Sequence, residues 1–320
     1  MPDILTVDVS GPVGLGRPLR QTARVFLPED AAQVHGVLCC LPGGSYDWHY
    51  WHLDVPGHHG YSFAEHFASI GYVVVTVDHL GIGESSPADG PPLRLDHLAR
   101  GDAAAVSEIR ERAKSGALHA ELPPVDVPFV GVGHSMGACL TVMVQAQQRC
   151  YDAVVLLGYS AAVDNVFDTD TAAGALEERI ATSAAGVRAL CGAPADVEVA
   201  MVDRSLVRGL FYADDVPEPV IAADTAVQAW TPIYASAEAA APGYATRYIE
   251  NIDVPVFLGF GDAVDLSPDP WAEPASYRRA SDVTLFVLTG SSHCHNFSTP
   301  RARLWDRIAA WLPAAGRSGL

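Results

Sequence analysis

Ser135 lies in a five-residue pattern that suits nucleophilic chemistry, Gly133-His134-Ser135-Met136-Gly137. A serine hydroxyl is a weak nucleophile until a base takes its proton, and it must also stand clear of its own backbone. A sharp turn between a strand and a helix exposes the side chain, but it crowds the positions two before and two after the serine. Glycine relieves that crowding at both positions. The pattern therefore predicts a serine nucleophile at such a turn.

The residues on either side of this pattern are typical of a strand and a helix. The run PFVGVGH (128–134) leads into the serine, and the apolar helical pattern MGACLTVMVQAQQR (136–149) follows it. The first turn of a helix leaves backbone N–H groups free and carries a favourable dipole, so it stabilises a developing oxyanion. We therefore expect the backbone N–H of Met136 to be one oxyanion donor.

Two glycine-rich stretches could instead indicate a nucleotide-binding loop, but neither has the required spacing. The dinucleotide pattern G-x-G-x-x-G would need glycine where Met136 stands, and in the run GIGESS the third glycine position is Ser86. A Walker-type lysine is also missing. We expect no nucleotide and no other cofactor.

The elements that must position these residues alternate between strand and helix patterns. Strands are expected at ILTVDV, TARVFLPE, VHGVLCCL, YVVVTVD, PFVGVGH, DAVVLLGYS, VPVFLGF and VTLFVLT. Helices are expected at SFAEHFASIG, LDHLARGDAAAVSEIRERAKSG, MGACLTVMVQAQQR and PRARLWDRIAAWLP. This alternation predicts an α/β fold with a mostly parallel sheet covered by helices on both faces. From residue 162 to 252 the chain is Ala-rich and helical without a convincing strand, so we expect a helical insertion there, with a core of residues 1–161 and 253–320.

Composition limits the class of protein. The chain has 320 residues, of which 49% are hydrophobic and 18% charged, so it can bury a large core. A net charge of −18 argues against a nucleic-acid-binding surface and against anionic membranes. The six cysteines lack zinc-type spacing, and we see neither a signal peptide nor an apolar run of membrane-spanning length. We expect a cytoplasmic protein.

Together these segments resemble the α/β-hydrolase fold family of serine hydrolases over nearly the whole chain. VLCCLPGGSYDW resembles the family's strand and oxyanion loop, GYSFAEHFASIGYVVVTVDHLGIGESS its helix, strand and Asp-x-x-Gly-x-Gly-x-Ser turn, and GHSMG its nucleophile elbow. Pro42 stands where the family often has histidine, which leaves the loop conformation open. The resemblance implies that the second oxyanion N–H comes from Gly44 or Ser45, and that the helical insertion is a cap.

The resemblance also implies the chain order serine, acid, histidine. LTGSSHCHNFSTP follows an apolar strand where the family carries a Gly-x-x-His segment, and His293 fits that register, with His295 as the rival. The run VPVFLGFGDAVDLSPDP offers Asp262, Asp265 and Asp269 as the acid. LSPDP resembles the stretch that trails the family's acid and favours Asp265. Asp262 is the alternative, and whichever of the two is not the acid is expected to cap a turn.

Aromatic residues suggest where substrate binds. Tyr46 and Trp48 follow the oxyanion loop, and we expect them either to line the mouth of the site or to pack the loop against the body. Phe211 and Trp230 are candidates in the insertion, where such residues also pack the cap itself. The four histidines between residues 49 and 59 lack a metallohydrolase spacing such as H-E-x-x-H, so we expect no metal site.

The resemblance and the apolar insertion predict a cofactor-free hydrolase acting on a carboxylic ester or lactone. Its substrate would be hydrophobic, bulky or macrocyclic, and would form an acyl-enzyme on Ser135. Amide or carbon–carbon hydrolysis, acyl transfer, and a non-catalytic small-molecule-binding role stay open. Dehalogenase and epoxide hydrolase chemistry are disfavoured, because related enzymes carry aspartate at the serine position. We expect a small molecule as partner, with no nucleic acid and no membrane, and leave open a homo-oligomer.

Overall fold

The computed structural model describes residues 2–160 and 174–316. At its centre is an eight-stranded sheet with the strand order β1-β2-β4-β3-β5-β6-β9-β10. β2 runs antiparallel to both of its neighbours, and the strands from β4 to β10 along this order run parallel to one another. The strands are β1 (Asp3–Asp8), β2 (Arg20–Phe26), β3 (Gly36–Leu41), β4 (Tyr72–Val77), β5 (Phe129–His134), β6 (Ala153–Leu157), β9 (Val256–Gly261) and β10 (Val283–Leu288).

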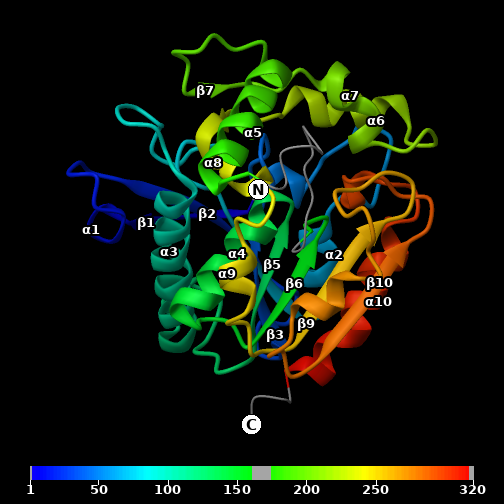
Figure 1. Ribbon diagram of the computed structural model, residues 1–320. Helices are drawn as coiled ribbons and strands as arrows, with labels where there is room; N and C mark the ends of the chain where they lie inside the picture. Colours follow the sequence, from blue (N-terminus) through cyan, green and yellow to red (C-terminus); the bar gives the residue numbers. More distant parts are fainter. Residues whose placement is uncertain (1, 161–173, 317–320) are drawn as a thin grey trace.

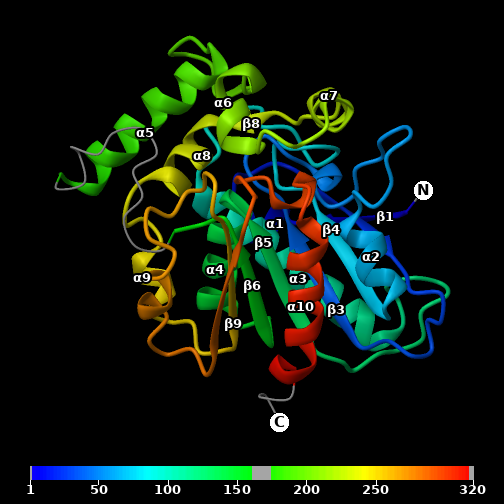
Figure 2. The same cartoon turned by 90° about the vertical axis from the view of Figure 1, so that its right-hand side faces the viewer.

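Helices cover both faces of this sheet (Figures 1 and 2). Figure 2 shows α4 and α9 to one side of the strands and α2 and α10 to the other. The helices of the body are α1 (Ser10–Val13), α2 (Phe63–Ser69), α3 (Leu95–Ser115), α4 (Met136–Gln148), α9 (Thr246–Ile249) and α10 (Arg301–Ala315). The predicted fold, a mostly parallel sheet between helical layers, is confirmed.

The strand residues explain these two layers. Successive side chains of a strand point to opposite faces, so a strand covered on both faces is apolar throughout. In β4, Val73 and Val75 pack into the hydrophobic cluster that contains α3 and α4, while Val74 packs into the cluster that contains α2 and α10. All three valines are fully buried. The continuous β-branched run is therefore what a central strand of this sheet requires.

The chain between β6 and β9 supplies the elements above the carboxyl ends of the strands (Figure 1). We call α5 to α8 the insertion helices. They are α5 (Leu176–Cys191), α6 (Arg204–Phe211), α7 (Glu218–Ala226) and α8 (Ile233–Ala240). A short antiparallel pair, β7 (Val199–Ala200) with β8 (Thr231–Pro232), joins them, so the expectation of an insertion without strands is wrong. Strands of two residues are too short to show a periodicity. The expected boundary at residues 161 and 162 lies outside the described residues.

The insertion helices are fastened to the body by a buried carboxylate. Glu238 of α8 is 4% exposed and accepts hydrogen bonds from the backbone N–H of Leu95 (2.6 Å) and from Nε of Arg94 (2.7 Å). Leu95 is the first residue of α3, where backbone N–H groups lack partners within the helix. A negative charge is favourable at this end of a helix dipole. Glu238 therefore caps α3 and ties the insertion to it.

All six cysteines lie within the described residues and are free thiols. Five of them are buried, namely Cys39, Cys40, Cys139, Cys150 and Cys294. Cys191, the last residue of α5, is partly exposed. Burial raises the pKa of Cys139 and of Cys150 to about 12, as expected for thiols that act as small hydrophobic residues. Over residues 2–160 and 174–316, we find no helix with the length and apolarity needed to span a bilayer.

Candidate active site

Ser135 stands at a strained turn between β5 and α4. Its backbone has φ 55° and ψ −122°, in the positive-φ range that residues other than glycine seldom adopt. Its N–H donates to the carbonyl of Leu157 in β6, at 2.8 Å, which fixes the turn against the neighbouring strand. α4 begins at Met136, immediately after the serine. The strand-to-helix turn expected from the sequence is present.

The two flanking glycines allow this turn to form. A Cβ atom on Gly133 would lie 2.4 Å from the carbonyl oxygen of Gly137 and 2.5 Å from Cα of Ala138. A Cβ on Gly137 would lie 2.1 Å from the carbonyl oxygen of Leu41. These atoms belong to the backbone and cannot move aside cheaply. Glycine is therefore required at both positions, because β5, α4 and the loop after β3 meet there.

Asp265, in the loop after β9, accepts four hydrogen bonds. Its Oδ1 accepts from Nδ1 of His293 at 2.8 Å and from the N–H of Leu266 at 2.7 Å. Its Oδ2 accepts from Nε2 of His295 at 2.8 Å and from the N–H of Gly261 at 2.7 Å. The carboxylate is fully buried, so these donors, rather than water, must stabilise its negative charge.

These donors keep Asp265 ionised. Burial alone would raise the pKa of Asp265, but the attraction and hydrogen bonds of His295 and His293 hold it well below its usual value. Asp262 is placed differently, because its carboxylate is exposed and accepts from the backbone N–H of Gly290 at 2.6 Å. The structure thus brings Asp265, and not Asp262, to His293. The bond from Asp262 to the turn at Gly290 is the use expected for the other aspartate.

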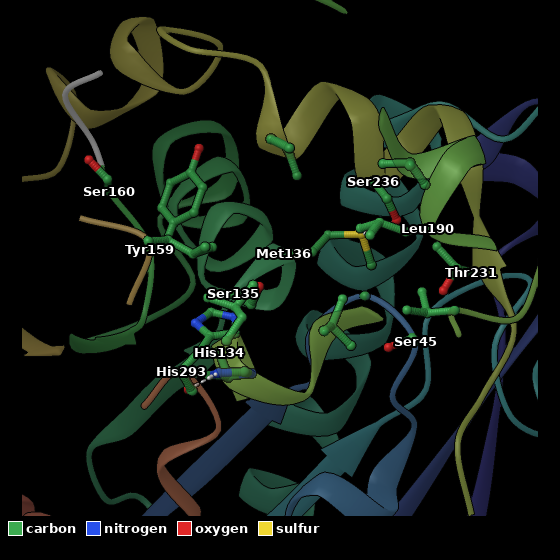
Figure 3. Close-up of a pocket in the computed structure, with 18 of the residues that line it drawn as sticks. Ser45, His134, Ser135, Met136, Tyr159, Ser160, Leu190, Thr231, Ser236 and His293 are labelled. Carbon is green, nitrogen blue, oxygen red and sulfur yellow. Dashed lines mark hydrogen bonds between the residues drawn. The ribbon is translucent and has the colours of Figure 1, made fainter. Parts of the chain in front are cut away.

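A single pocket contains Ser135 and His293. It is lined by side chains from the body and from the insertion helices, among them Tyr46, Met136, Tyr159, Val187, Leu190, Val202, Val207, Leu210, Phe211 and Leu266. Figure 3 shows the imidazole of His293 beside Ser135. His295 is fully buried and does not line this pocket, although it shares Asp265. Of the two candidate histidines, His293 alone can therefore reach the serine from the pocket.

Backbone N–H groups suited to an oxyanion lie at the same pocket. Gly44, Ser45 and Met136 all line it. Within the part of the chain that the structure describes, the N–H groups of these three residues have no acceptor. Ser45 has φ 67°, so the loop after β3 turns sharply at this point. The geometry offers Met136 and Gly44, or Ser45, as donors to an oxyanion.

The loop that contains Pro42 is held from beneath by a buried histidine. Nε2 of His79 donates to the carbonyl of Pro42 at 2.9 Å, and Nδ1 of His79 bonds the carboxylate of Asp102 at 2.9 Å. All the side-chain atoms of this chain of hydrogen bonds are inaccessible to solvent. Burial lowers the pKa of His79, but Asp102 more than offsets this, and the net shift is upward. The loop conformation that Pro42 left open is thus set by His79.

His134, next to the serine, lies under the site and faces no solvent. Its Nε2 donates to the carbonyl of His293 at 2.9 Å, and its ring stacks on Tyr50 at 4.1 Å between centroids. Burial, followed by repulsion from His293 and His295, lowers its pKa well below 6.5. His134 therefore supports the backbone of His293 as a neutral ring.

The four aromatic candidates for substrate contact divide into two pairs. Tyr46 and Phe211 line the pocket, whereas Trp48 and Trp230 do not. Trp48 packs outside it, with the guanidinium of Arg24 lying 4.3 Å from its ring centroid. Trp230 is 52% exposed, immediately before β8. Trp48 thus follows the second of the two expectations, packing against the body, whereas the expectation that Trp230 contacts substrate is corrected, because its side chain does not line the pocket.

The sequence reading missed three pocket residues, Val187, Leu190 and Val207, that helical spacing could have identified. Val187 and Leu190 of α5, and Val207 and Leu210 of α6, are spaced three residues apart and line the pocket together. Residues three apart share one face of a helix. By contrast, Leu206 of α6 is 60% exposed and does not line the pocket. Within the described ranges, no three His, Cys, Asp or Glu side chains converge as a metal site would require.

Comparison with known proteins identifies the family and the fold of the chain. The sequence model of the Alpha/beta hydrolase family matches residues 34–307. No curated protein matches the chain. An esterase from Thermogutta terrifontis, solved with malate bound, is 18% identical with a TM-score of 0.64, over 98% of this chain and 99% of that one. A soluble variant of monoglyceride lipase from Saccharomyces cerevisiae, solved with a substrate analogue, is 15% identical with a TM-score of 0.69, over 99% and 95%. Est1E from Butyrivibrio proteoclasticus, solved with ferulic acid, is 14% identical with a TM-score of 0.56, over 97% and 98%.

Proposed function

Because this chain belongs to the alpha/beta hydrolase family, we propose that it is a serine hydrolase that cleaves a hydrophobic carboxylic ester or lactone. Ser135 is the nucleophile, His293 the general base and Asp265 the acid that orients it. One observation carries this proposal. The Asp265–His293 pair, bonded at 2.8 Å, opens onto the same pocket as the serine of a strained strand-to-helix turn.

The hydrogen bond between Asp265 and His293 determines the tautomer of the base. Since Nδ1 of His293 donates to the carboxylate, its Nε2 is the nitrogen with a free lone pair. That nitrogen takes the proton of Ser135 as the serine oxygen attacks the substrate carbonyl carbon. The resulting imidazolium is stabilised by a carboxylate that stays ionised, because its pKa is held low.

The remaining steps use the oxyanion donors and water. The N–H groups of Met136 and Gly44 hold the negative oxygen of the tetrahedral intermediate. His293 then gives its proton to the leaving alcohol oxygen, and the acyl group remains on Ser135 as an ester. A water molecule, deprotonated by His293, attacks the carbonyl carbon of this ester. His293 then returns the proton to the Ser135 oxygen as the carboxylic acid leaves. With a lactone, alcohol and acid leave as one hydroxy acid.

The pocket wall supports a neutral, hydrophobic substrate. Among the described residues that line it, no side chain is Asp, Glu, Lys or Arg, and most are aliphatic or aromatic. A charged substrate group would lose its hydration there without gaining an oppositely charged side chain. Apolar groups gain about 25 cal/mol for each Å² buried, so large acyl or alcohol groups are favoured. We infer a bulky aromatic or macrocyclic ester or lactone.

We infer further that the insertion helices, α5 to α8, form the cap over this site. Val187, Leu190, Val207 and Leu210 come from the insertion helices, and they supply much of the apolar wall. The cap therefore sets the preference for the substrate, while the body supplies the chemistry.

Two experiments test the proposal. A fluorophosphonate probe should label the wild-type protein at Ser135 and leave Ser135→Ala unlabelled. A failure to label would favour a non-catalytic binding protein. A panel of p-nitrophenyl esters and lactones should then give a higher kcat/KM for bulky aromatic or macrocyclic members than for acetate. A panel in which acetate and butyrate esters are best would contradict the proposed substrate class.

A matched pair of variants on one helix tests the role of the cap. Leu210→Ala should lower kcat/KM for bulky esters by about 10-fold, in the range expected when apolar contacts are lost from a pocket, with less effect on acetate. Leu206→Ala, on the exposed side of the same helix, should change neither. Equal effects of the two variants would show that the wall of α6 does not select the substrate.

A further inference from the structure

Arg204, the first residue of α6, reaches from the insertion to the oxyanion loop, residues 42–46. Its Nη1 donates to the hydroxyl of Ser45 at 2.8 Å, and its Nη2 donates to the carbonyl of Ser45 at 3.1 Å. The Arg204 side chain is 6% exposed, so these bonds do not compete with water. The forked guanidinium thus binds both the hydroxyl and the carbonyl oxygen of a single residue, a geometry that lysine cannot reproduce.

Arg204 also packs against two neighbouring aromatic rings. Its guanidinium carbon lies 4.4 Å from the ring centroid of Tyr46 and 4.9 Å from that of Phe211. Arginine stacks favourably on aromatic faces in this way. Asp224 of α7, 1% exposed, balances the charge, with its Oδ2 3.9 Å from Nε of Arg204. The same Oδ2 accepts from the hydroxyls of Tyr46, at 3.0 Å, and Tyr212. The orientation of the guanidinium is therefore determined by packing and charge together.

Ser45 needs such support because its backbone is in an unfavourable conformation. Its φ of 67° lies in the left-handed region, where a residue with a Cβ atom is strained. A second donor from the insertion, the N–H of Ala229, reaches the same carbonyl at 3.0 Å. With its carbonyl oxygen fixed from the insertion side, the Ser45 peptide cannot relax to an ordinary turn. The backbone N–H groups of Gly44 and Ser45 are then kept at the pocket, which both residues line.

The other end of α6 touches the second catalytic loop. The backbone N–H of His293 donates to the carbonyl of Leu210 at 3.0 Å, and the N–H of Cys294 donates to the carbonyl of Phe211 at 3.0 Å. Leu210 and Phe211 are the last two residues of α6. This helix, two turns long, therefore bonds the oxyanion loop at its start and the histidine loop at its end.

We propose that Arg204 is a positioning residue for the oxyanion hole, through which α6 of the insertion sets the geometry of the catalytic loops as well as the shape of the pocket. The proposal rests on the proposed function, because it requires an oxyanion formed on attack by Ser135. It implies that changes at Arg204 act on the transition state, whereas changes in the apolar wall act on the choice of substrate.

The test separates positioning from charge balance. Arg204→Met leaves Asp224 buried without its cation, so the single variant is compared with the double variant Arg204→Met/Asp224→Asn, which removes both charges. We expect kcat for a p-nitrophenyl ester to fall about 10- to 100-fold in the double variant, as when a reacting group is misplaced by about 1 Å, with KM changed less than about 3-fold. The rate of Ser135 inactivation by a fluorophosphonate should fall in parallel. Arg204→Lys should keep only part of the rate, and added guanidinium should raise kcat of the double variant.

Arg188 of α5 provides the matched control. It is also an arginine of the insertion, 15% exposed, and it donates to the carbonyls of Pro194 and Val197 within the insertion. Arg188→Met should therefore disturb the insertion without lowering kcat more than about 3-fold.

Each result has a definite meaning. If wild-type Ser135 is not labelled by the probe, the proposed function fails and the role of Arg204 falls with it. If Ser135 is labelled and the double variant keeps wild-type kcat and inactivation rate, Arg204 merely neutralises Asp224 and the positioning role is overturned. A folded double variant in which KM rises while kcat is unchanged also overturns it. Equal losses of kcat in the Arg188 and Arg204 variants would assign the effect to the stability of the insertion.

Discussion

Replacing Asp265 with asparagine should remove nearly all activity, because an amide group cannot accept all the hydrogen bonds that the carboxylate accepts. Four N–H groups point at the two oxygens of Asp265, two at each. Asparagine offers one oxygen and one NH₂ group, so one pair of donors must face other donors. If the NH₂ group faces His293, it forces Nδ1 of that ring to accept, and the proton moves to Nε2, where the base is needed. If it faces the other pair, the negative charge that stabilises the imidazolium is still lost.

The size of both effects follows from these contacts. Loss of the orienting carboxylate of a serine–histidine–aspartate triad lowers kcat by about 10⁴, or about 5.4 kcal/mol at 1.36 kcal/mol for each tenfold change. Either orientation of the amide also leaves a buried backbone N–H, of Leu266 or of Gly261, without an acceptor. An unsatisfied buried donor costs about 1–3 kcal/mol of stability. The Asp265→Asn variant should therefore be folded but measurably less stable.

The assay compares two neighbouring aspartates. We would measure kcat/KM on a p-nitrophenyl ester and the free energy of unfolding in urea for Asp265→Asn and Asp262→Asn. Asp262 is exposed and accepts from the backbone N–H of Gly290, a bond that an asparagine oxygen can keep. Asp262→Asn should thus stay within about 3-fold of wild-type activity and within about 1 kcal/mol of its stability, as for most exposed substitutions. An inactive Asp262→Asn beside an active Asp265→Asn would refute the reasoning and reverse the assignment of the acid.

Four further predictions concern the elbow, its neighbours and the lack of a cofactor. Ser135→Ala should lower ester turnover by about 10⁶ with an unchanged circular dichroism spectrum, and near-wild-type turnover would remove Ser135 from the mechanism. Gly137→Ala places a Cβ 2.1 Å from the carbonyl oxygen of Leu41 and should lower the free energy of unfolding in urea by more than about 1–3 kcal/mol. Gly209→Ala, in open space on α6, should raise the free energy of unfolding by up to about 1 kcal/mol. Equal effects of the two variants would contradict the steric argument. His134 has a folded-state pKa well below its unfolded value near 6.5, so the native state binds fewer protons and loses stability as pH falls below 6.5. His134→Gln should flatten the loss measured between pH 7 and pH 5, and an unchanged slope would show that His134 does not contribute to it. Activity should survive dialysis against excess EDTA, while a loss restored by zinc or manganese would point to the histidines between residues 49 and 59.

The sequence could predict what depends on neighbours along the chain. The glycines around Ser135 indicate that a Cβ atom would clash at those positions, and the valine run of β4 indicates a strand that is buried on both faces. Both constraints act within a few residues and leave a pattern. The choice of Asp265 over Asp262 also depended on a short stretch of sequence, and the contact between Asp265 and His293 supports it.

The parts that sequence reasoning missed depend on contacts between distant residues. Arg204 and Ser45 are 159 positions apart, and nothing in either local sequence indicates that they meet. The direction of an aromatic side chain in a loop is equally hidden, so the same reasoning selected Tyr46, which lines the pocket, and Trp48 and Trp230, which do not. His295 reaches Asp265 because a 3-10 turn, His295–Phe297, begins there. His295 is two residues from His293 and is therefore a second candidate for the base in the sequence. In the structure both histidines instead bond the carboxylate of Asp265.

The burial of the thiols gives the native chain a single convenient place for a spectroscopic label. Five cysteines are buried, and Cys191 alone is partly exposed. It ends α5, directly after Leu190, whose side chain lines the pocket. Burial raises its pKa, so a maleimide will react there slowly, but more readily than at the sealed thiols. A fluorophore attached at Cys191 would let ligand binding be followed by its emission in real time, without a single substitution in the protein.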